Sequence, residues 1–290
     1  MSHKAGFVSI IGKPNVGKST LMNALIGEKL SITNPKAQTT RHRILGIYND
    51  DDHQIVFSDT PGLLDPAYKL QESMMSLVES AIKDADLLLY LVETEEPFNE
   101  KFIEGLNKVE TSKIVILNKA DLNQQEQIAA RIAEWKQKLT TAKILPVSAL
   151  HKFHTKELLE LVKEHLPEHP PYYDKDDLTD RPVRFFVAEM IRGAILKHFK
   201  KEVPYAVEVV VMDYKEDTKV DRIEATIFVE RESQKMIMIG QGGRAIKRVG
   251  MEARKSIENF IQKKVFLDLT VKVRKDWRSN ENDLKEFGYQ

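Results

Sequence analysis

The chain has 290 residues, a length that usually holds two domains, and its 44 basic residues are balanced by 44 acidic ones. Because the charges balance, no global field attracts the chain to nucleic acid or membrane, so any such attraction has to be local. The absence of cysteine excludes disulfide bonds and cysteine-based zinc sites, and no apolar run approaches the roughly 18 residues that span a bilayer.

The first predicted elements are a buried strand at Phe7–Ile11 and a helix at Ser19–Ile26, joined by a loop that fits the pattern GxxxxGK[ST]. In such a loop, backbone N–H groups and the helix N-terminus point at phosphates. Lys18 would neutralise the β- and γ-phosphate oxygens, and the Ser19 hydroxyl would ligate Mg²⁺. The predicted phosphate-binding residues are Gly12, Lys13, Pro14, Asn15, Val16, Gly17, Lys18, Ser19 and Thr20.

A threonine pair lies in a polar stretch before the next predicted strand, Ile44–Tyr48. We expect one of the two, Thr40 in preference to Thr39, to bind Mg²⁺ only when a γ-phosphate is present. Taken alone, such a pair is more often part of an exposed loop.

The strand predicted at Gln54–Ser58 ends in a turn with the sequence Asp-Thr-Pro-Gly. Asp59 would hold Mg²⁺ through water, and the Gly62 N–H would sense the γ-phosphate. Thr60 and Pro61 complete this predicted segment of the nucleotide site.

An NKxD tetrad follows the strand predicted at Ile114–Leu117, at the sheet edge where ligands bind. Asp121 would accept hydrogen bonds from guanine N1–H and the 2-amino group, which adenine does not offer together, so adenine is rejected. A further strand, Ala142–Pro146, leads to a loop whose backbone N–H would meet guanine O6, although that tripeptide taken alone is more often a plain strand end. The predicted base-binding residues are Asn118, Lys119, Ala120, Asp121, Ser148 and Ala149.

With these motifs in order, the first half resembles the translation-factor-like class of small GTPases. The resemblance implies an α/β P-loop domain with a mostly parallel sheet and helices on both faces, and hydrolysis of GTP by in-line attack of water. Residues expected to contribute to catalysis are Asn15, Lys18, Thr40 and Gly62. Leu63 stands where many GTPases carry the glutamine that orients water, so slow intrinsic hydrolysis is expected.

Asn15 suggests a second cation. In GTPases that this chain resembles, an asparagine at this place can ligate K⁺, whose charge would act where an arginine finger otherwise does. The alternative is that Asn15 only shapes the turn.

The composition changes near Leu166, where a proline-rich, charged connector begins. The predicted organisation is a GTPase domain at 1–166, a semi-rigid linker at 167–183, a second domain at 184–275 and a polar C-terminal tail at 276–290. The elements predicted beyond the connector are a helix at Arg184–Phe199, a hairpin of strands at Tyr205–Asp213 and Asp221–Glu230, a helix at Ser233–Ile239, a Gly240–Gly243 turn, a helix at about Arg244–Lys263 and a strand at Val265–Val273.

That order, with its GxxG turn, resembles an α+β type II KH domain. The glycines would let the chain approach a nucleic-acid backbone closely, and the following helix N-terminus would face the phosphates. Ile237, Ile239 and Ile246 would form an apolar floor under single-stranded bases. The predicted RNA-binding residues are Lys235, Ile239, Gly240, Gln241, Gly242, Gly243, Arg244, Lys247 and Arg248, with Arg254 and Lys255 close by. Gln241 replaces a lysine that the family often places in this turn, so one phosphate contact fewer is expected.

A GTPase domain followed by a KH domain resembles the Era family, the bacterial GTPases of small ribosomal subunit assembly. Phrases that match its pattern include Arg181–Phe185, Glu202–Tyr205, Ile239–Gly243 and Val271–Arg278. The resemblance implies that the KH groove binds the 3′ end of 16S ribosomal RNA, that the protein acts in 30S subunit maturation, and that GTP favours RNA binding.

Two alternatives stay open at this point. One is a GTP switch for a protein or membrane partner that docks on the KH fold, and the other is a nucleotide kinase, which NKxD argues against. Because only six residues precede the first predicted strand, no signal peptide is expected. The expected location is the cytoplasm, and a fraction bound peripherally to the inner membrane is a second option. The expected state is a monomer.

Overall fold

The computed structural model of the chain describes residues 3–289, which form two compact units. The first unit contains the residues up to Ser31 together with Thr40–Asp65 and Met74–Asp180, and the second contains Ile32–Thr39, Pro66–Ser73 and the residues from Arg181 onward. In the described part of the chain, no helix is long and apolar enough to cross a membrane.

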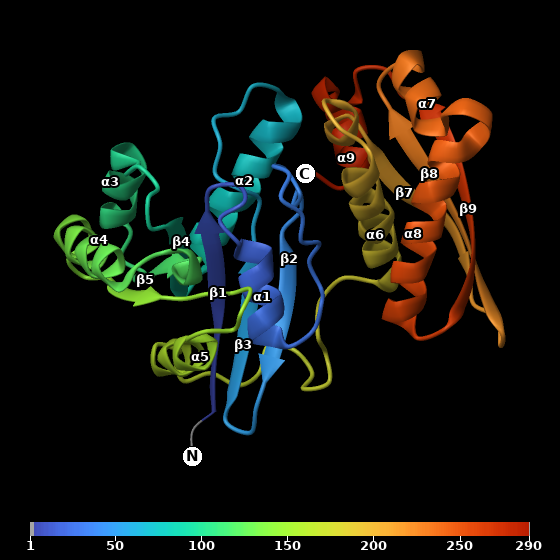
Figure 1. Ribbon diagram of the computed structural model, residues 1–290. Coiled ribbons are helices and arrows are strands. Elements are labelled where there is room, and N and C mark those ends of the chain that lie inside the picture. Colours follow the sequence, from blue (N-terminus) through green and yellow to red (C-terminus); the bar gives the residue numbers. More distant parts are fainter. Residues whose placement is uncertain (1–2, 290) are drawn as a thin grey trace. The chain divides into compact units, whose positions relative to one another are not determined.

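The first unit is built on a six-stranded sheet with the strand order β2-β3-β1-β4-β5-β6. Strands β1 to β5 are labelled in Figure 1. Only β2 runs antiparallel to its neighbour, and the other strands pair in parallel. The central strands are almost wholly buried, as is usual for a parallel sheet covered by helices. The strands are β1 (Lys4–Gly12), β2 (Ile44–Asn49), β3 (His53–Asp59), β4 (Leu87–Glu93), β5 (Ser112–Asn118) and β6 (Lys143–Pro146).

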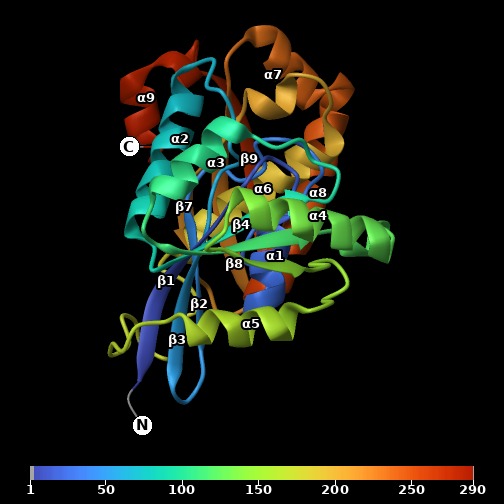
Figure 2. The ribbon, with the colours of Figure 1, turned by 90° about the vertical axis from the view of Figure 1, so that its left-hand side faces the viewer.

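Helices cover both faces of this sheet, as predicted, and Figure 2 shows α1 and α2 on opposite sides of the strands. Apolar residues of α2, α3 and α4 form one core with β4 and β5, including the buried Trp135. The helices of this unit are α1 (Lys18–Ile26), α2 (Lys69–Asp84), α3 (Glu100–Lys108), α4 (Gln125–Lys138) and α5 (Thr155–Glu164).

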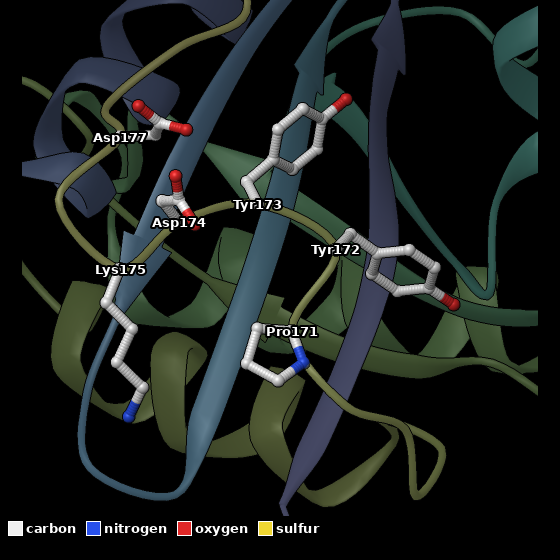
Figure 3. Close-up of a pocket in the computed structure, with 6 residues that line it drawn as sticks. All are labelled: Pro171, Tyr172, Tyr173, Asp174, Lys175 and Asp177. Carbon is white, nitrogen blue, oxygen red and sulfur yellow. The ribbon is translucent and has the colours of Figure 1, made fainter.

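The connector lies on the first unit as far as Asp180. It covers the free edge of β2, where Ile47 N donates to Leu178 O at 2.9 Å and Thr179 Oγ1 donates to Leu45 O at 2.7 Å. The buried Gln54 side chain accepts from the N–H groups of Tyr172 and Tyr173 at 2.6 and 3.0 Å. An edge strand left open invites pairing with other chains, and these hydrogen bonds protect the edge of β2 from such pairing. Figure 3 shows connector side chains between Pro171 and Asp177.

The second unit has a three-stranded sheet in the order β7-β8-β9, with β7 and β8 antiparallel and β8 and β9 parallel. Apolar residues of α6, α7 and α8 pack on the sheet in one core. The elements are α6 (Val183–His198), β7 (Glu208–Lys215), β8 (Val220–Val229), α7 (Glu232–Ile239), α8 (Arg244–Ile261) and β9 (Lys264–Val273). The order of elements is the one predicted for the type II KH fold.

The strand predicted to begin at Tyr205 begins instead at Glu208. Val203–Tyr205 form a short 3₁₀ turn because Pro204 lacks the N–H that a strand ladder needs. The carbonyl of Ala206 accepts a hydrogen bond from the Trp277 indole at 3.1 Å. The other predicted elements of this unit have bounds within three residues of those observed.

The residues after β9 pack on the second unit. Trp277 is fully buried, and the hydroxyl of buried Tyr289 donates to Glu208 Oε2 at 2.6 Å. A short helix, α9 (Glu281–Glu286), is capped at its N-terminus by Asn280, whose side chain accepts from two backbone N–H groups.

Candidate nucleotide-binding and RNA-binding sites

The loop between β1 and α1 has the backbone geometry of a phosphate cradle. Gly12 and Gly17 have φ of 152° and 103°, and Asn15 has φ of 66°, in the left-handed region. A Cβ on Gly12 would lie 2.4 Å from Leu91 O, and one on Gly17 would lie 2.3 Å from Asn118 Nδ2. Both positions therefore need glycine for space as well as for conformation.

Lys18 is buried at the start of α1, and its ammonium donates to the carbonyls of Gly12 and Lys13 at 3.1 and 2.9 Å. Burial lowers the Lys18 pKa to about 8, although the nearby Asp59 carboxylate raises it. An anionic phosphate is the partner that would favour the charged ammonium.

Three oxygen-bearing side chains converge beside this lysine. Ser19 Oγ donates to Asp59 Oδ2 at 2.7 Å and lies 2.9 Å from Thr40 Oγ1, which lies 3.3 Å from the same carboxylate oxygen. Burial raises the pKa of Asp59, and its Oδ1 has no hydrogen-bond partner in the described structure. Hard oxygen donors around a buried, unpaired carboxylate oxygen fit Mg²⁺. The Thr39 hydroxyl is engaged elsewhere, donating to Lys36 O at 2.5 Å.

The turn after β3 lies against the phosphate loop. Thr60 Oγ1 donates to Ile10 O at 2.8 Å, and Leu63 N donates to Gly12 O at 3.0 Å. A Cβ on Gly62 would lie 2.7 Å from Pro14 N. The backbone after Asp59 is thus held directly beside the predicted phosphate site.

Asn118, at the end of β5, ties the base-binding loops together. Its amide donates to Val16 O at 2.7 Å, and its oxygen accepts from Ala149 N at 3.0 Å. The adjacent Ala120 N donates to Val147 O at 3.1 Å. The phosphate loop, the NKxD tetrad and the loop containing Ser148 and Ala149 therefore meet, as the motifs predict.

Two residues near the tetrad were not predicted from the sequence. Glu93, at the end of β4, pairs with Lys119 at 2.6 Å, and the exposed His151 lies 3.6 Å from the Asp121 carboxylate. Glu93 could have been predicted because it ends a strand at the sheet edge where ligands bind. His151 lies in a loop with no motif of its own, so no pattern indicated it.

In the second unit, α7 ends at Ile239 and α8 begins at Arg244. Gly240, Gly242 and Gly243 all have positive φ, between 59° and 74°. Nothing lies within 4 Å of a Cβ built on Gly242 or Gly243, so their backbone is open to a ligand. Arg244 folds back on the turn and donates to Gln241 Oε1 at 2.6 Å.

A groove of about 300 Å³ runs between α8 and the edge strand β9. Its rim is basic and its floor is apolar. The lining residues are Ile246, Lys247, Gly250, Met251, Arg254, Phe266, Leu267 and Leu269.

Of the predicted RNA-binding side chains, Arg244, Lys247 and Arg248 are exposed and Lys235 is half-buried. Ile246 lines the groove, whereas Ile237 and Ile239 do not appear in its lining. The sequence did not point to Met251 or Phe266, which are 60% and 58% exposed. The sequence did offer a signal for Phe266. It lies on the same face of its strand as Asp268 and Thr270, and a large apolar residue on an otherwise polar, exposed face can mark a binding surface.

Two family models match the chain, described as "50S ribosome-binding GTPase" over residues 7–119 and "KH domain" over residues 202–278. GTPase Era of Staphylococcus haemolyticus (strain JCSC1435) is 43% identical over 291 residues, which cover 99% of this chain and 97% of that protein. The chain belongs to the Era family of GTPases.

Solved Era structures also match the chain. An Era structure in complex with MgGDPNP and nucleotides 1506–1542 of 16S ribosomal RNA has a TM-score of 0.95 and 35% identity, with 99% of each chain covered. An Aquifex aeolicus Era variant bound to GDP and AlF4⁻ gives the same TM-score with 36% identity, again over 99% of each chain.

This Era-family chain is therefore a GTPase with a P-loop domain and a KH domain, which confirms the predicted fold class and reaction. Hydrolysis of GTP excludes the nucleotide-kinase alternative. A solved Era relative contains Mg²⁺ together with a GTP analogue.

Proposed function

We propose that this GTPase binds the 3′ end of 16S ribosomal RNA through its KH groove and acts in assembly of the small ribosomal subunit. The observation that carries the proposal is the groove between α8 and β9, which is lined by the basic residues Lys247 and Arg254 and by Ile246, three residues after the open glycine turn. An Era relative that matches 99% of the chain binds this RNA segment.

We further propose the roles of the nucleotide-site residues. Lys18 and the phosphate-loop N–H groups bind the phosphates, and Asp121 binds guanine. Ser19, Thr40 and Asp59, the last through water, hold Mg²⁺, which when bound neutralises charge on the β- and γ-phosphates. The Gly62 N–H senses the γ-phosphate. Leu63 cannot hydrogen-bond to the attacking water, so slow intrinsic hydrolysis stays a prediction.

The RNA proposal is tested by titrating a fluorescent single-stranded RNA of the 16S 3′ end, and a scrambled RNA, with the protein loaded with a non-hydrolysable GTP analogue. We expect sequence-dependent binding. Lys247→Ala should weaken RNA binding and reduce the slope of log affinity against log salt concentration by about one. Lys156 is an exposed lysine of α5 in the first unit, and Lys156→Ala should change neither the affinity nor the slope. Binding of neither RNA would contradict the proposal and favour docking of a protein or membrane partner.

Asn15 is proposed as a ligand of K⁺ that accelerates hydrolysis. Its side chain is exposed in the phosphate loop, and its φ of 66° is one that asparagine tolerates. Faster hydrolysis in KCl than in NaCl, with the difference lost in Asn15→Ala, is expected. Equal rates in the two salts, unchanged by the substitution, would leave Asn15 as a residue that only shapes the turn. A monomeric state and a peripheral membrane fraction stay predictions.

A further inference from the structure

A buried ion pair on α6 faces a segment that comes from far earlier in the chain. Arg192 is 1% exposed, and its guanidinium donates from Nε and Nη2 to the two oxygens of Glu189 at 2.7 and 2.6 Å. Both residues belong to the second unit, as does the segment Ile32–Thr39. Such a planar, two-pronged pair fixes the direction in which the remaining N–H groups point.

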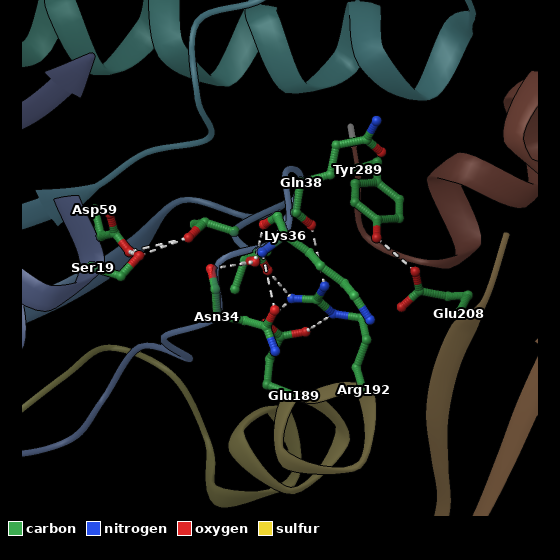
Figure 4. Close-up of polar contacts among 11 residues, drawn as sticks. Ser19, Asn34, Lys36, Gln38, Asp59, Glu189, Arg192, Glu208 and Tyr289 are labelled. Atoms are coloured by element: carbon green, nitrogen blue, oxygen red, sulfur yellow. Dashed lines mark hydrogen bonds and ion pairs between the residues drawn. The ribbon is translucent and has the colours of Figure 1, made fainter. Parts of the chain in front are cut away.

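Those remaining N–H groups point at backbone carbonyls (Figure 4). Arg192 Nη2 donates to Thr39 O, and Nη1 lies 3.4 Å from Gln38 O. Thr40 follows these two residues directly, and its hydroxyl lies with Ser19 and Asp59 at the proposed Mg²⁺ site. The guanidinium thus holds the backbone immediately before the threonine.

The end of α6 holds the same segment a second time. Lys36 Nζ donates to the carbonyls of Leu196 and Phe199, at the C-terminal end of the helix. The last carbonyls of a helix lack intrahelical partners and carry partial negative charge, so an ammonium is a suitable cap. The side chain of Ile32 also packs against Gly193, where a Cβ would lie 3.3 Å from Ile32 Cγ2.

We propose that Arg192 is a positioning residue for GTP hydrolysis: by holding the carbonyls of Gln38 and Thr39, it places the Thr40 hydroxyl for Mg²⁺ in the GTP state. This rests on the proposed role of Thr40. Arg192 lies outside every nucleotide-binding motif and belongs to the first helix of the second domain. A lysine in its place would keep the charge but not the two-pronged geometry that engages Glu189 and the carbonyls together.

The test uses the full chain with Arg192→Gln and Arg192→Lys, and measures single-turnover GTP hydrolysis across Mg²⁺ concentrations, Mg²⁺–GDP affinity and thermal unfolding. We expect Arg192→Gln to lower the rate about tenfold and to raise the Mg²⁺ concentration needed for half-maximal rate. Without Arg192 the Thr40 hydroxyl is no longer held in the position to bind Mg²⁺, and small displacements of groups at a reacting centre slow the reaction. GDP affinity should stay within about twofold, since Thr40 binds metal only in the triphosphate state. Arg192→Lys should fall between Arg192→Gln and the unsubstituted protein.

Two controls separate positioning from folding. Arg274→Gln removes another multiply paired arginine of the same unit, which contacts Asp283 at 2.7 Å and pairs with Glu286, and should leave the Mg²⁺ dependence unchanged. Lys36→Met releases the same segment while leaving the Arg192–Glu189 pair in place, and should shift the Mg²⁺ dependence in the direction of Arg192→Gln.

Unchanged Mg²⁺ dependence in both Arg192→Gln and Lys36→Met would overturn the proposal, as would an equal shift in Arg274→Gln. Thr40→Ala distinguishes this failure from failure of the proposed metal site. If Thr40→Ala alters the Mg²⁺ dependence while the Arg192 variants do not, only the positioning role is wrong. If Thr40→Ala also leaves it unchanged, the assignment of Thr40 to Mg²⁺ is wrong.

Discussion

At the scale of single residues, the nucleotide site contains two buried groups whose charged forms are each disfavoured by burial. Burial lowers the pKa of Lys18 to about 8 and raises the pKa of Asp59, and their mutual attraction opposes both shifts only in part. A phosphate anion beside Lys18 and a divalent cation beside Asp59 would each restore the charged form. Ligand binding should therefore be coupled to proton binding.

The pH dependence of GDP affinity follows from Lys18. The ligand-free pKa is about 8, and a bound phosphate raises it, so the complex binds more protons than the free protein. Affinity should be level below pH 8 and should fall as pH rises above it, by up to about tenfold per unit. Titrations of fluorescent GDP from about pH 7 to about pH 9.5 measure this. A flat profile would show that Lys18 keeps its proton throughout, and Lys18→Met, which has no proton to bind, is the control.

At the scale of secondary structure, the sequence predicted elements whose signals are local. The apolar run before Gly12 and the phosphate-loop pattern identified β1 and α1, and alternating residues identified β8 and β9. The order of the KH elements was confirmed because each carries its own periodicity. The nucleotide-site residues were predicted from short motifs rather than from periodicity, and their individual roles stay predictions.

What the sequence did not predict depends on segments that meet only after folding. The connector at 167–180 pairs with the edge of β2, and its proline-rich composition gives no sign of that contact. Phe266 lines the groove because β9 is an edge strand. The association of Ile32–Thr39 with α6 involves residues such as Arg192, about 150 residues later in the chain, which no local pattern relates to this segment.

The close approach of two loops makes Gly62 a sensitive position. In Gly62→Ala, the new Cβ would lie 2.7 Å from Pro14 N and 2.8 Å from Pro14 Cα, so one loop has to shift. We expect GTP hydrolysis to fall by about 10- to 100-fold, because small displacements near the reacting atoms are costly. Single-turnover hydrolysis measures this. The matched control is Gly105→Ala in α3, where nothing lies within 4 Å of the Cβ and where stability should rise by up to about 1 kcal/mol. Equal rates in the two variants would contradict the expectation.

At the scale of the whole molecule, two segments close in sequence to Thr40 and Gly62 belong to the unit that carries the RNA groove. Ile32–Thr39 and Pro66–Ser73 cluster with the residues from Arg181 onward. Tyr68 joins the two segments by donating to Gln38 Oε1 at 3.1 Å, and the Arg278 guanidinium lies 4.9 Å from its ring centroid. Lys69 also pairs with Glu281 in α9. Ile32–Thr39, which directly precedes Thr40, therefore shares one set of contacts with Pro66–Ser73 and the KH fold.

This arrangement predicts reciprocal coupling between nucleotide and RNA. If the KH groove binds RNA more tightly with a GTP analogue than with GDP, RNA must raise the preference for the analogue over GDP by the same factor, which is typically about 5- to 150-fold. Titrating RNA in both nucleotide states, and both nucleotides with and without RNA, closes the cycle. Tyr68→Phe removes the hydroxyl that bonds Gln38 but keeps the ring beside Arg278, whereas Tyr68→Ala removes both. The factor should therefore fall more in Tyr68→Ala than in Tyr68→Phe. Equal RNA affinity in the two nucleotide states would mean that the domains act as independent modules, because a ligand without differential affinity shifts no equilibrium.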